Sequence, residues 1–281
     1  MNNKNITDVE NFWNTNPLFT GESENRPGSS DYFIEHTSVY VNDCFAGRFD
    51  FNTIPSYLCG KKVLDLGCGP GFWIEQLAKS FPKEIVAADL TDQALNLAKQ
   101  RVEMLNIRNC TFAKANAEDL PFDDSEFEHI NCQGVVHHTP DTGKALKEIS
   151  RVLCENGTFS ISVYYRNIFL RTWPIIRFTG KVLAKLGAGL KGRGRETIFE
   201  LDDVDEIVKY YDGSDNPIGK AYARDDILKL LPEDLIVDKV FLHFFPARSL
   251  PVKIPNIFHR YLDKSFGFMI YITGTKSGLR R

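Results

Sequence analysis

The run over residues 63–71, Val-Leu-Asp-Leu-Gly-Cys-Gly-Pro-Gly, constrains the fold of this chain more than any other part of the sequence. A short apolar stretch leads into an acidic residue and then into three glycines, Gly67, Gly69 and Gly71. Glycine loses the most backbone entropy on folding and adopts positive φ easily, so this density is typical of a turn that a ligand approaches closely. We therefore expect a buried strand that ends in a ligand-binding turn.

The spacing of these glycines distinguishes between two kinds of nucleotide ligand. The dinucleotide fingerprint is G-x-G-x-x-G, which holds a pyrophosphate at a helix N-terminus. This chain has G-x-G-x-G followed by Phe72. Asp65 stands just before the glycines, where its carboxylate would repel a pyrophosphate and attract an ammonium group. The pattern favours a cationic, amino-acid-bearing adenosine ligand over a nicotinamide dinucleotide.

A second acidic residue, Asp89, ends the next predicted strand. It stands at the distance from the glycine turn at which an acid can accept hydrogen bonds from both hydroxyls of a ribose. Carboxylates therefore end two successive strands of the predicted sheet, an arrangement that suits a cationic ribonucleoside ligand.

With these residues in place, the sequence resembles the class I S-adenosylmethionine-dependent methyltransferases of the ubiquinone-methyltransferase-like group, also called methyltransferase type 11. The resemblance covers roughly residues 60 to 165. Five blocks occur in the order that the family has, at residues 64–71, 88–90, 116–122, 133–141 and 145–153. The glycines alone are a weak signal, but five ordered blocks are a strong one.

The resemblance implies an α/β fold, Rossmann-like and doubly wound, with seven strands in the order 3-2-1-4-5-7-6. It also implies S-adenosyl-L-methionine as the cofactor, S-adenosyl-L-homocysteine as the product, and no metal ion. Asp65 would lie near the ligand's amino group, Asp89 would hold the ribose, and Asn116 would reach the adenine, although the family more often has aspartate there. The implied cofactor-binding residues are Asp65, Gly67, Cys68, Gly69, Gly71, Asp89, Leu90, Asn116, Ala117 and Gln133.

Two adjacent histidines, His137 and His138, follow the fourth predicted strand, at the sheet edge where open α/β folds bind ligands. Histidine has an ordinary pKa that suits proton removal near neutral pH, so we expect a general base here, with His138 preferred over His137. The alternative is that one of them caps the following helix and the other packs. Tyr165, at the end of the fifth strand, and Tyr32 are the candidate contacts to the methyl acceptor.

The order of apolar runs predicts four segments. From Lys61 to Tyr165 these runs alternate with helical patterns, as in the βαβ units of a parallel sheet. We expect strands near 61–66, 84–88, 110–114, 127–133 and 157–164, and the resemblance implies two more near 235–245 and 266–274. The segments are an N-terminal lid (1–58), a cofactor-binding core (59–165), a basic helical insertion or acceptor cap (166–222), and a completion of the sheet (223–281).

The N-terminal segment and the insertion each allow more than one interpretation. The aromatic residues of 1–58 form either a lid that excludes water from the cofactor cleft or a helix packed on the sheet edge. The insertion predicts a helix that begins at Thr172, with Arg177, Lys181 and Lys185 on one side and Ile175, Phe178, Val182 and Leu186 on the other. Such a helix can contact an anionic membrane over 172–190, cover an anionic or lipid-like acceptor, or present a solvated charged face.

The residues after this helix continue the basic character. Glycines 187, 189, 192 and 194 predict a flexible tail, and the acidic stretch 200–206 is the expected partner of the basic residues. Residues 166–195 hold eight lysines and arginines and no acid, while the whole chain has a net charge of −3. The positive charge is therefore a local feature, and a nucleic-acid partner is disfavoured.

The amino-acid composition limits the classes of protein to which this chain can belong. The chain has 281 residues, of which 43% are hydrophobic and 25% charged, as is ordinary for a globular protein. There is no long apolar run and no apolar signal core after Met1, so we expect a cytoplasmic protein with peripheral membrane contact as an option. Six scattered cysteines without a C-x-x-C pair predict reduced thiols and no zinc site.

The sequence therefore predicts a methyltransferase that acts by in-line displacement on a small-molecule or lipid-like acceptor. Two alternatives remain at this point. One is an NAD-dependent oxidoreductase, which the glycine spacing opposes, and the other is a non-catalytic, membrane-associating binding protein.

Overall fold

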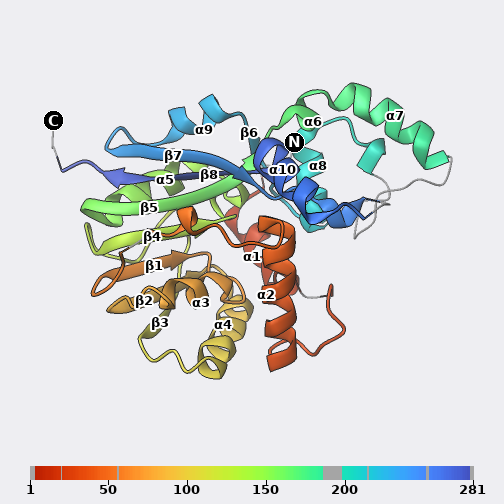
Figure 1. Ribbon diagram of the computed structural model, residues 1–281. Helices are drawn as coiled ribbons and strands as arrows, with labels where there is room; N and C mark the ends of the chain where they lie inside the picture. Colours follow the sequence, from red (N-terminus) through yellow and green to blue (C-terminus); the bar gives the residue numbers. More distant parts are fainter. Residues whose placement is uncertain are drawn as a thin grey trace.

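A computed structural model describes residues 4–19, 21–55, 57–185, 198–213, 215–250 and 253–278. Figure 1 shows a twisted sheet with helices packed along it, and a group of further helices, among them α6, α7, α8 and α10, at the end where β5 leads into α6. In the part of the chain that the structure describes, no helix combines the length and the apolar character needed to cross a membrane.

The sheet contains eight strands in a mixed arrangement. Seven of them follow the order β3-β2-β1-β4-β5-β8-β7, and β6 pairs separately with β5. Strands β1 to β5 pair in parallel, while β8 runs antiparallel to both β5 and β7. The strands are β1 Lys62–Leu66, β2 Glu84–Asp89, β3 Cys110–Lys114, β4 Phe127–Gln133, β5 Leu153–Tyr165, β6 Ala221–Tyr222, β7 Leu235–His243 and β8 Met269–Lys276. With β6 set aside, this is the predicted order 3-2-1-4-5-7-6, which is confirmed.

Capping side chains fix where several helices begin. Asn5, Ser29, Thr91 and Asp141 each accept a hydrogen bond from a backbone N–H in the first turn of the helix that follows. The helices are α1 Ile6–Thr15, α2 Ser30–Phe45, α3 Phe72–Ala78, α4 Asp92–Met104, α5 Thr142–Val152, α6 Ile168–Arg171, α7 Trp173–Lys185, α8 Val204–Asp212, α9 Arg224–Leu230 and α10 Asn256–Phe266.

The sheet is buried on both faces, which explains why its strands read as nearly continuous apolar runs. Along β1, Val63 belongs to one core cluster, and Leu64 and Leu66 belong to the cluster on the other face. The first cluster also holds Phe72, Ile74 and Leu95 from α3 and α4, and the second holds Leu146 and Ile149 from α5.

The fifth strand begins earlier than the sequence predicts. It covers Leu153–Tyr165 rather than 157–164, because the pairing with β4 shifts between Phe127, opposite Leu153, and His129, opposite Thr158. This irregularity lets the strand start directly after α5 while keeping its later residues in register with β4.

The insertion forms the predicted helix α7, and its cations and its apolar residues lie on two different sides. Arg177 pairs with Asp202 and donates from Nε to the Phe199 carbonyl at 3.1 Å, and Lys181 pairs with Glu200 at 2.7 Å. The predicted pairing with the acidic stretch is thus confirmed for Arg177 and Lys181, and both ion pairs are partly exposed to solvent. Leu186 and the glycines at 187–194 lie outside the described residues.

Candidate functional site

A cavity of about 290 Å³ lies where the parallel strands end. It is lined by Leu66 at the end of β1 and Gly67 directly after it, by Asp89 at the end of β2, by Gln133 at the end of β4 and by Tyr164 near the end of β5. The carboxyl ends of parallel strands meet at one edge of a sheet, which is where open α/β folds bind ligands. The N-terminal segment and α8 supply the remaining walls.

The glycine turn after β1 is shaped by its contacts with β2 and with the loop after β4. The backbone N–H groups of Gly67 and Cys68 both donate to the Ala88 carbonyl, at 2.7 and 3.0 Å. Gly67 has φ +73°, and a Cβ there would lie 2.1 Å from Cγ2 of Val135. Only glycine therefore fits this position, and the backbone stays open toward the cavity.

Asp89 is held by three hydrogen bonds. Its Oδ2 accepts from the Gly69 N–H at 3.0 Å, and its Oδ1 accepts from the backbone N–H and the hydroxyl of Thr91, both at 2.9 Å. Burial raises the pKa of Asp89, while these hydrogen bonds act in the opposite direction. The carboxylate that lines the cavity is therefore fixed in orientation by the glycine turn itself.

Asp65 lies deeper, beneath the same turn. Its Oδ1 accepts from Asn131 Nδ2 at 2.7 Å, but its Oδ2 is buried and has no hydrogen-bond partner among the described residues. Burial raises the pKa of Asp65 to about 7, the Asn131 hydrogen bond lowers it, and the Asp89 charge raises it. Such a carboxylate lacks one donor, and the ammonium group of an amino-acid ligand is a donor of the right charge.

A chain of amides connects Asp65 to the cavity wall. Asn131 Oδ1 accepts from Gln133 Nε2 at 2.9 Å, and the same Nε2 donates to the Ser160 hydroxyl at 2.7 Å. Gln133 lines the cavity, and its Oε1 is buried without a hydrogen-bond partner in the described part of the chain. Both ends of this chain thus have an unused acceptor oxygen.

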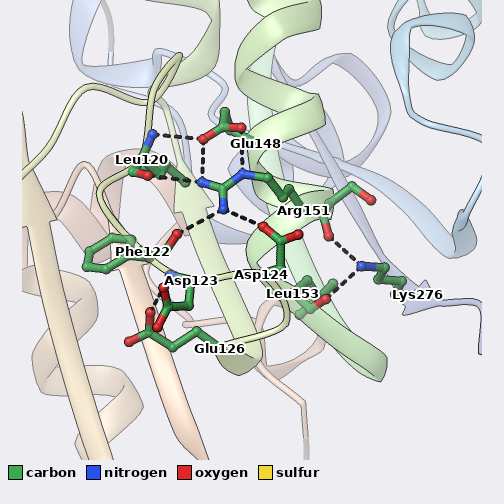
Figure 2. A network of polar contacts seen from close by, with 10 residues as sticks. Leu120, Phe122, Asp123, Asp124, Glu126, Glu148, Arg151, Leu153 and Lys276 are labelled. Carbon is green, nitrogen blue, oxygen red and sulfur yellow. Dashed lines mark hydrogen bonds and ion pairs between the residues drawn. The ribbon is translucent and has the colours of Figure 1, made fainter.

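Asn116 and Ala117 line the cavity from the loop after β3. Asn116 Oδ1 accepts from the Glu118 N–H at 3.0 Å, which forms a tight local turn. The rest of this loop is anchored by Arg151 of α5, as Figure 2 shows. Arg151 donates to the carbonyls of Leu120 and Phe122 at 3.0 and 2.9 Å.

Glu148 completes this anchor. Its two carboxylate oxygens accept from Arg151 Nε and Nη2 at 2.8 and 2.7 Å, and Oε2 also accepts from the Leu120 N–H at 2.8 Å (Figure 2). A bidentate pair of this kind adds geometric specificity to its charge. The sequence block at 145–153 therefore has a structural role in holding the loop that carries Asn116.

The two histidines also line the cavity and differ in their surroundings. His137 is 1% exposed, and neither ring nitrogen has a hydrogen-bond partner among the described residues. Burial lowers the pKa of His137 well below its ordinary value, and the nearby His138 and Lys220 lower it further. His137 is therefore neutral and a weak base at physiological pH.

His138 faces a carboxylate that comes from the insertion. Its Nδ1 lies 2.7 Å from the Ile218 carbonyl, which can only accept, so Nδ1 carries a proton and Nε2 is the basic nitrogen. Nε2 lies 3.5 Å from Oδ2 of Asp212, at the end of α8. The Tyr164 hydroxyl donates to the same carboxylate, 3.1 Å from each oxygen. His138, Asp212 and Tyr164 thus form one polar cluster on the cavity wall.

The N-terminal segment supplies part of the cavity wall. Ile6, Val9 and Trp13 of α1 line it, and the Trp13 ring contacts the His138 ring at a centroid distance of 5.2 Å. Val9 and Phe12 of α1 are buried, and Glu10 forms a 2.8 Å ion pair with the partly exposed Lys114. His36 of α2 also lines the cavity.

The structure brings seven of the ten predicted cofactor residues to the cavity wall and places the rest behind it. Asp65 and Cys68 are buried beneath the glycine turn. Gly71 packs against Arg101 and Ala98, where a Cβ would lie 3.2 and 3.4 Å from their side-chain and backbone atoms. The residues that line it are Gly67, Gly69, Asp89, Leu90, Asn116, Ala117 and Gln133.

The two predicted acceptor contacts do not line the cavity. Tyr165 packs with the core cluster on the other face of the sheet, since successive strand residues alternate between faces, and its neighbour Tyr164 takes the cavity position. Tyr32 is fully buried within the N-terminal segment and donates to the Leu18 carbonyl at 3.3 Å.

Sequence reasoning missed Asn131 and Asp212. Asn131 had a signal, since a polar residue within a buried strand needs a partner and the adjacent strand offered Asp65. Asp212 had none, because its place beside His138 depends on how the insertion folds back through β6, which pairs with Tyr164 and Tyr165.

Comparisons with known proteins point to the same family as the five sequence blocks. Residues 59–181 match the family model of a methyltransferase domain. The chain is 34% identical over 105 residues to the uncharacterized methyltransferase YcgJ of Bacillus subtilis, covering 37% of this chain and 41% of YcgJ. It is 32% identical over 131 residues to the demethylmenaquinone methyltransferase of Bacillus cereus, covering 46% of this chain and 55% of that protein. The chain therefore spans about half the length of these curated relatives.

Solved structures show the same fold over most of the chain. The structure of YcgJ aligns with a TM-score of 0.52 at 17% identity, covering 87% of this chain and 100% of YcgJ. An S-adenosylmethionine-dependent methyltransferase from Mesorhizobium loti aligns with a TM-score of 0.51 at 14% identity, covering 80% of this chain and 94% of that one. The resemblance found in the five sequence blocks is confirmed. Residues 59–181 of the chain are a methyltransferase domain, on the fold of the S-adenosylmethionine-dependent methyltransferases.

Proposed function

We propose that this protein transfers a methyl group from S-adenosylmethionine to a small or lipid-like acceptor. The observation that carries the proposal is one cavity whose lining includes two chemically different groups of residues. The first group is the glycine turn with Asp89 and Asn116, and the second is His137, His138 and Asp212. A donor and an acceptor held in one cavity meet the main requirement of methyl transfer, which is alignment.

The residues around the glycine turn fit the cofactor by their chemistry. Asp65 Oδ2, buried behind the cavity wall without a donor among the described residues, would attract the ammonium group. Asp89 would accept from the ribose hydroxyls, and Asn116 with the backbone at Ala117 would bind the adenine. Gly67 and Gly69 leave space for the ligand beside the backbone.

The rest of the lining favours an acceptor with an apolar or aromatic body. Aromatic side chains come from the N-terminal segment, α8, β8 and the residue after β7, and they include Trp13, Tyr40, Tyr211, Phe244 and Tyr271. Planar molecules stack well on such walls. The similarity to a demethylmenaquinone methyltransferase supports the same class, an apolar ring system.

S-adenosylmethionine supplies an activated methyl group, so the protein has to align the acceptor, exclude water and remove any proton. We assign the proton to His138 Nε2, because Nδ1 is engaged with the Ile218 carbonyl. The Asp212 carboxylate, 3.5 Å away, compensates the charge that the imidazole then gains. His137 is neutral and shapes the wall beside it.

The N-terminal segment serves as the lid in this proposal. Its first helix, α1, lines the cavity with Ile6, Val9 and Trp13 and is joined to the core by exposed polar contacts such as Glu10 with Lys114, whereas α2 is held by the buried Arg101 of α4. Exposed contacts contribute little stability individually, so α1 can open for exchange of ligands.

Two measurements test the function. Isothermal titration calorimetry should detect saturable binding of S-adenosylmethionine but not of NAD, and Asp89→Ala should weaken binding by about 1–3 kcal/mol, the scale of lost charge-assisted hydrogen bonds. Metabolite extracts incubated with the protein and a methyl-labelled cofactor should then yield a labelled product by mass spectrometry. Binding of NAD alone would instead support an oxidoreductase, and an unchanged affinity in Asp89→Ala would remove that residue from the site.

A further inference from the structure

Two helices near the insertion carry large apolar side chains that point away from the protein. We call these sets the apolar rows of α7 and α10. On α7, Ile175, Phe178 and Val182 are 68, 71 and 48% exposed. On α10, Ile257, Phe258 and Tyr261 are 75, 62 and 64% exposed. Exposed apolar sets of this kind mark interaction sites, whereas single exposed residues need no explanation.

The row of α7 faces outward because the other side of the helix is occupied. Trp173 is buried and stacks on Phe199 at a centroid distance of 5.8 Å. Arg177 and Lys181 are paired with Asp202 and Glu200 on that same side. Turning the helix to bury its apolar row would break these pairs.

The row of α10 is fixed in the same way. Asp263 is 2% exposed and accepts from His243 Nδ1 at 2.5 Å and from the Phe245 N–H at 3.2 Å. His259 is also buried, and its Nε2 lies 3.0 Å from the Phe245 carbonyl. These polar contacts hold the inner side of α10, so its apolar side remains in solvent.

The two helices belong to one end of the molecule. Phe169 of α6, which directly precedes α7, contacts the Phe266 ring at the end of α10 at 5.6 Å. Asn167 Nδ2 donates to the Phe266 carbonyl at 2.9 Å. Figure 1 shows α6, α7 and α10 beyond the same end of the sheet.

The charges beside the rows are mostly positive, and the exposed acids next to α7, Asp202 and Glu200, are paired with Arg177 and Lys181. Residues 166–185 contain no acid, and the only acid in 253–266 is the buried Asp263. Exposed cations accompany the apolar residues, namely Arg171, Lys253, Arg260 and Lys264. An occupant of this surface must therefore accept apolar side chains and offer negative charge. A second copy of the chain, packed by the same surface, would place cations against cations.

We propose that α7 and α10 dock this protein on the surface of an anionic phospholipid bilayer. The apolar rows enter the boundary between headgroups and acyl chains, and the surrounding cations lie at the level of the anionic headgroups. This inference goes beyond the proposed methyl transfer and does not require it. Together, the two would let the protein draw a lipid-like acceptor from the bilayer.

Sedimentation with vesicles tests the proposal directly. The wild-type protein should bind vesicles of phosphatidylcholine mixed with phosphatidylglycerol, bind pure phosphatidylcholine much more weakly, and lose affinity as salt is raised. The double variants Ile175→Ser/Phe178→Ser and Phe258→Ser/Tyr261→Ser should each reduce partitioning on the order of tenfold or more, since each removes two large apolar side chains from the contact.

Phe81→Ser is the matched control. Phe81 is 76% exposed and lies between α3 and β2, away from both rows, so its loss should leave binding unchanged. Thermal unfolding of every variant shows whether it folds. Absence of binding to the mixed vesicles, or equal binding by both double variants and the wild type, overturns the proposal. Self-association that the same serine variants abolish, without vesicle binding, would assign the surface to a second copy instead.

Discussion

At the scale of single residues, the two aspartates beneath and beside the glycine turn have different tasks because their partners differ. Asp89 has both carboxylate oxygens in hydrogen bonds from Gly69 and Thr91, and it lines the cavity. Asp65 has one oxygen bound to Asn131 and the other without a partner among the described residues. The Asp89 carboxylate is thus held in one orientation, in which it can accept further hydrogen bonds from a ligand. The Asp65 carboxylate has one oxygen that can still accept a hydrogen bond from a cationic group.

Affinity for the cofactor product should therefore depend on pH through Asp65. Burial raises the pKa of this residue to about 7, so below that pH its proton must leave before an ammonium group can bind. We expect the association constant of S-adenosylhomocysteine to be flat just above pH 7 and to fall up to about tenfold per pH unit below it. Calorimetry across this range measures the slope.

Asp65→Asn is the control for this dependence. The variant should bind more weakly above pH 7 by about 1.5–3 kcal/mol and should lose the slope, since its amide does not titrate. A flat profile in the wild type, or the same slope in Asp65→Asn, would contradict the assignment of the ammonium group to this carboxylate.

The base assignment gives a second residue-scale prediction. His138→Gln should lower kcat roughly 10²–10⁴-fold and leave the Kd of S-adenosylhomocysteine unchanged, because it removes the nitrogen that takes the proton. Asp212→Asn should lower kcat less, and the double variant should resemble His138→Gln, since the two residues act as one unit. His259→Gln, buried but outside the cavity lining, is the control. If the fold-decreases in kcat of the two single variants multiply in the double variant, Asp212 acts independently of His138.

At the scale of elements, helix α2 is tied to the core by a buried arginine of α4. Arg101 is 1% exposed, its Nη1 lies 3.0 Å from His36 Nδ1 on α2, and its Nη2 donates to Glu75 on α3 at 2.8 Å. Burial lowers the pKa of Arg101, and Glu75 opposes that shift. One guanidinium thus connects the N-terminal segment with the two helices that follow the glycine turn.

Removal of this arginine should be costly. Arg101→Met should lower the free energy of unfolding by about 3–5 kcal/mol, because it leaves Glu75 largely buried without its main partner. Lys79 pairs with the same carboxylate at 3.2 Å but is 58% exposed, so Lys79→Met should change stability by about 0.5 kcal/mol or less. Urea denaturation measures both. Similar losses in the two variants would mean that Arg101 is not the link between these helices.

Sequence patterns predicted where the strands and helices lie in the chain better than which side of a helix faces the protein. The parallel strands and α7 were predicted because local periodicity and the glycine motif determine them. The orientation of α7 was not, since it depends on pairs that Arg177 and Lys181 make with residues after the insertion. Asp212 was missed for the same reason, since its position also depends on contacts between residues far apart in the chain. A carboxylate brought to His138 by a long-range contact leaves no local pattern in the sequence.

At the scale of the whole molecule, the cavity is assembled from parts that are far apart in the chain. The glycine turn supplies its floor, the N-terminal segment supplies Trp13 and His36, and α8 supplies Tyr211 and Asp212. Such a cavity can exist only when these parts are packed together. Ligand binding should therefore stabilise their packing, by about 2.7 kcal/mol at a ligand concentration of 100 times Kd.

Trp13 reports whether the lid takes part in this change. Trp73 and Trp173 are 4 and 6% exposed, whereas Trp13 is only half-buried, so quenching of tryptophan fluorescence by acrylamide reports mainly on Trp13. We expect S-adenosylhomocysteine at saturation to reduce this quenching, because the segment that carries Trp13 closes over the ligand. Trp13→Phe should remove the change while keeping the binding seen by calorimetry. Quenching that stays constant while calorimetry shows saturation would mean that the N-terminal segment is a fixed wall of the cavity, already closed before the ligand binds.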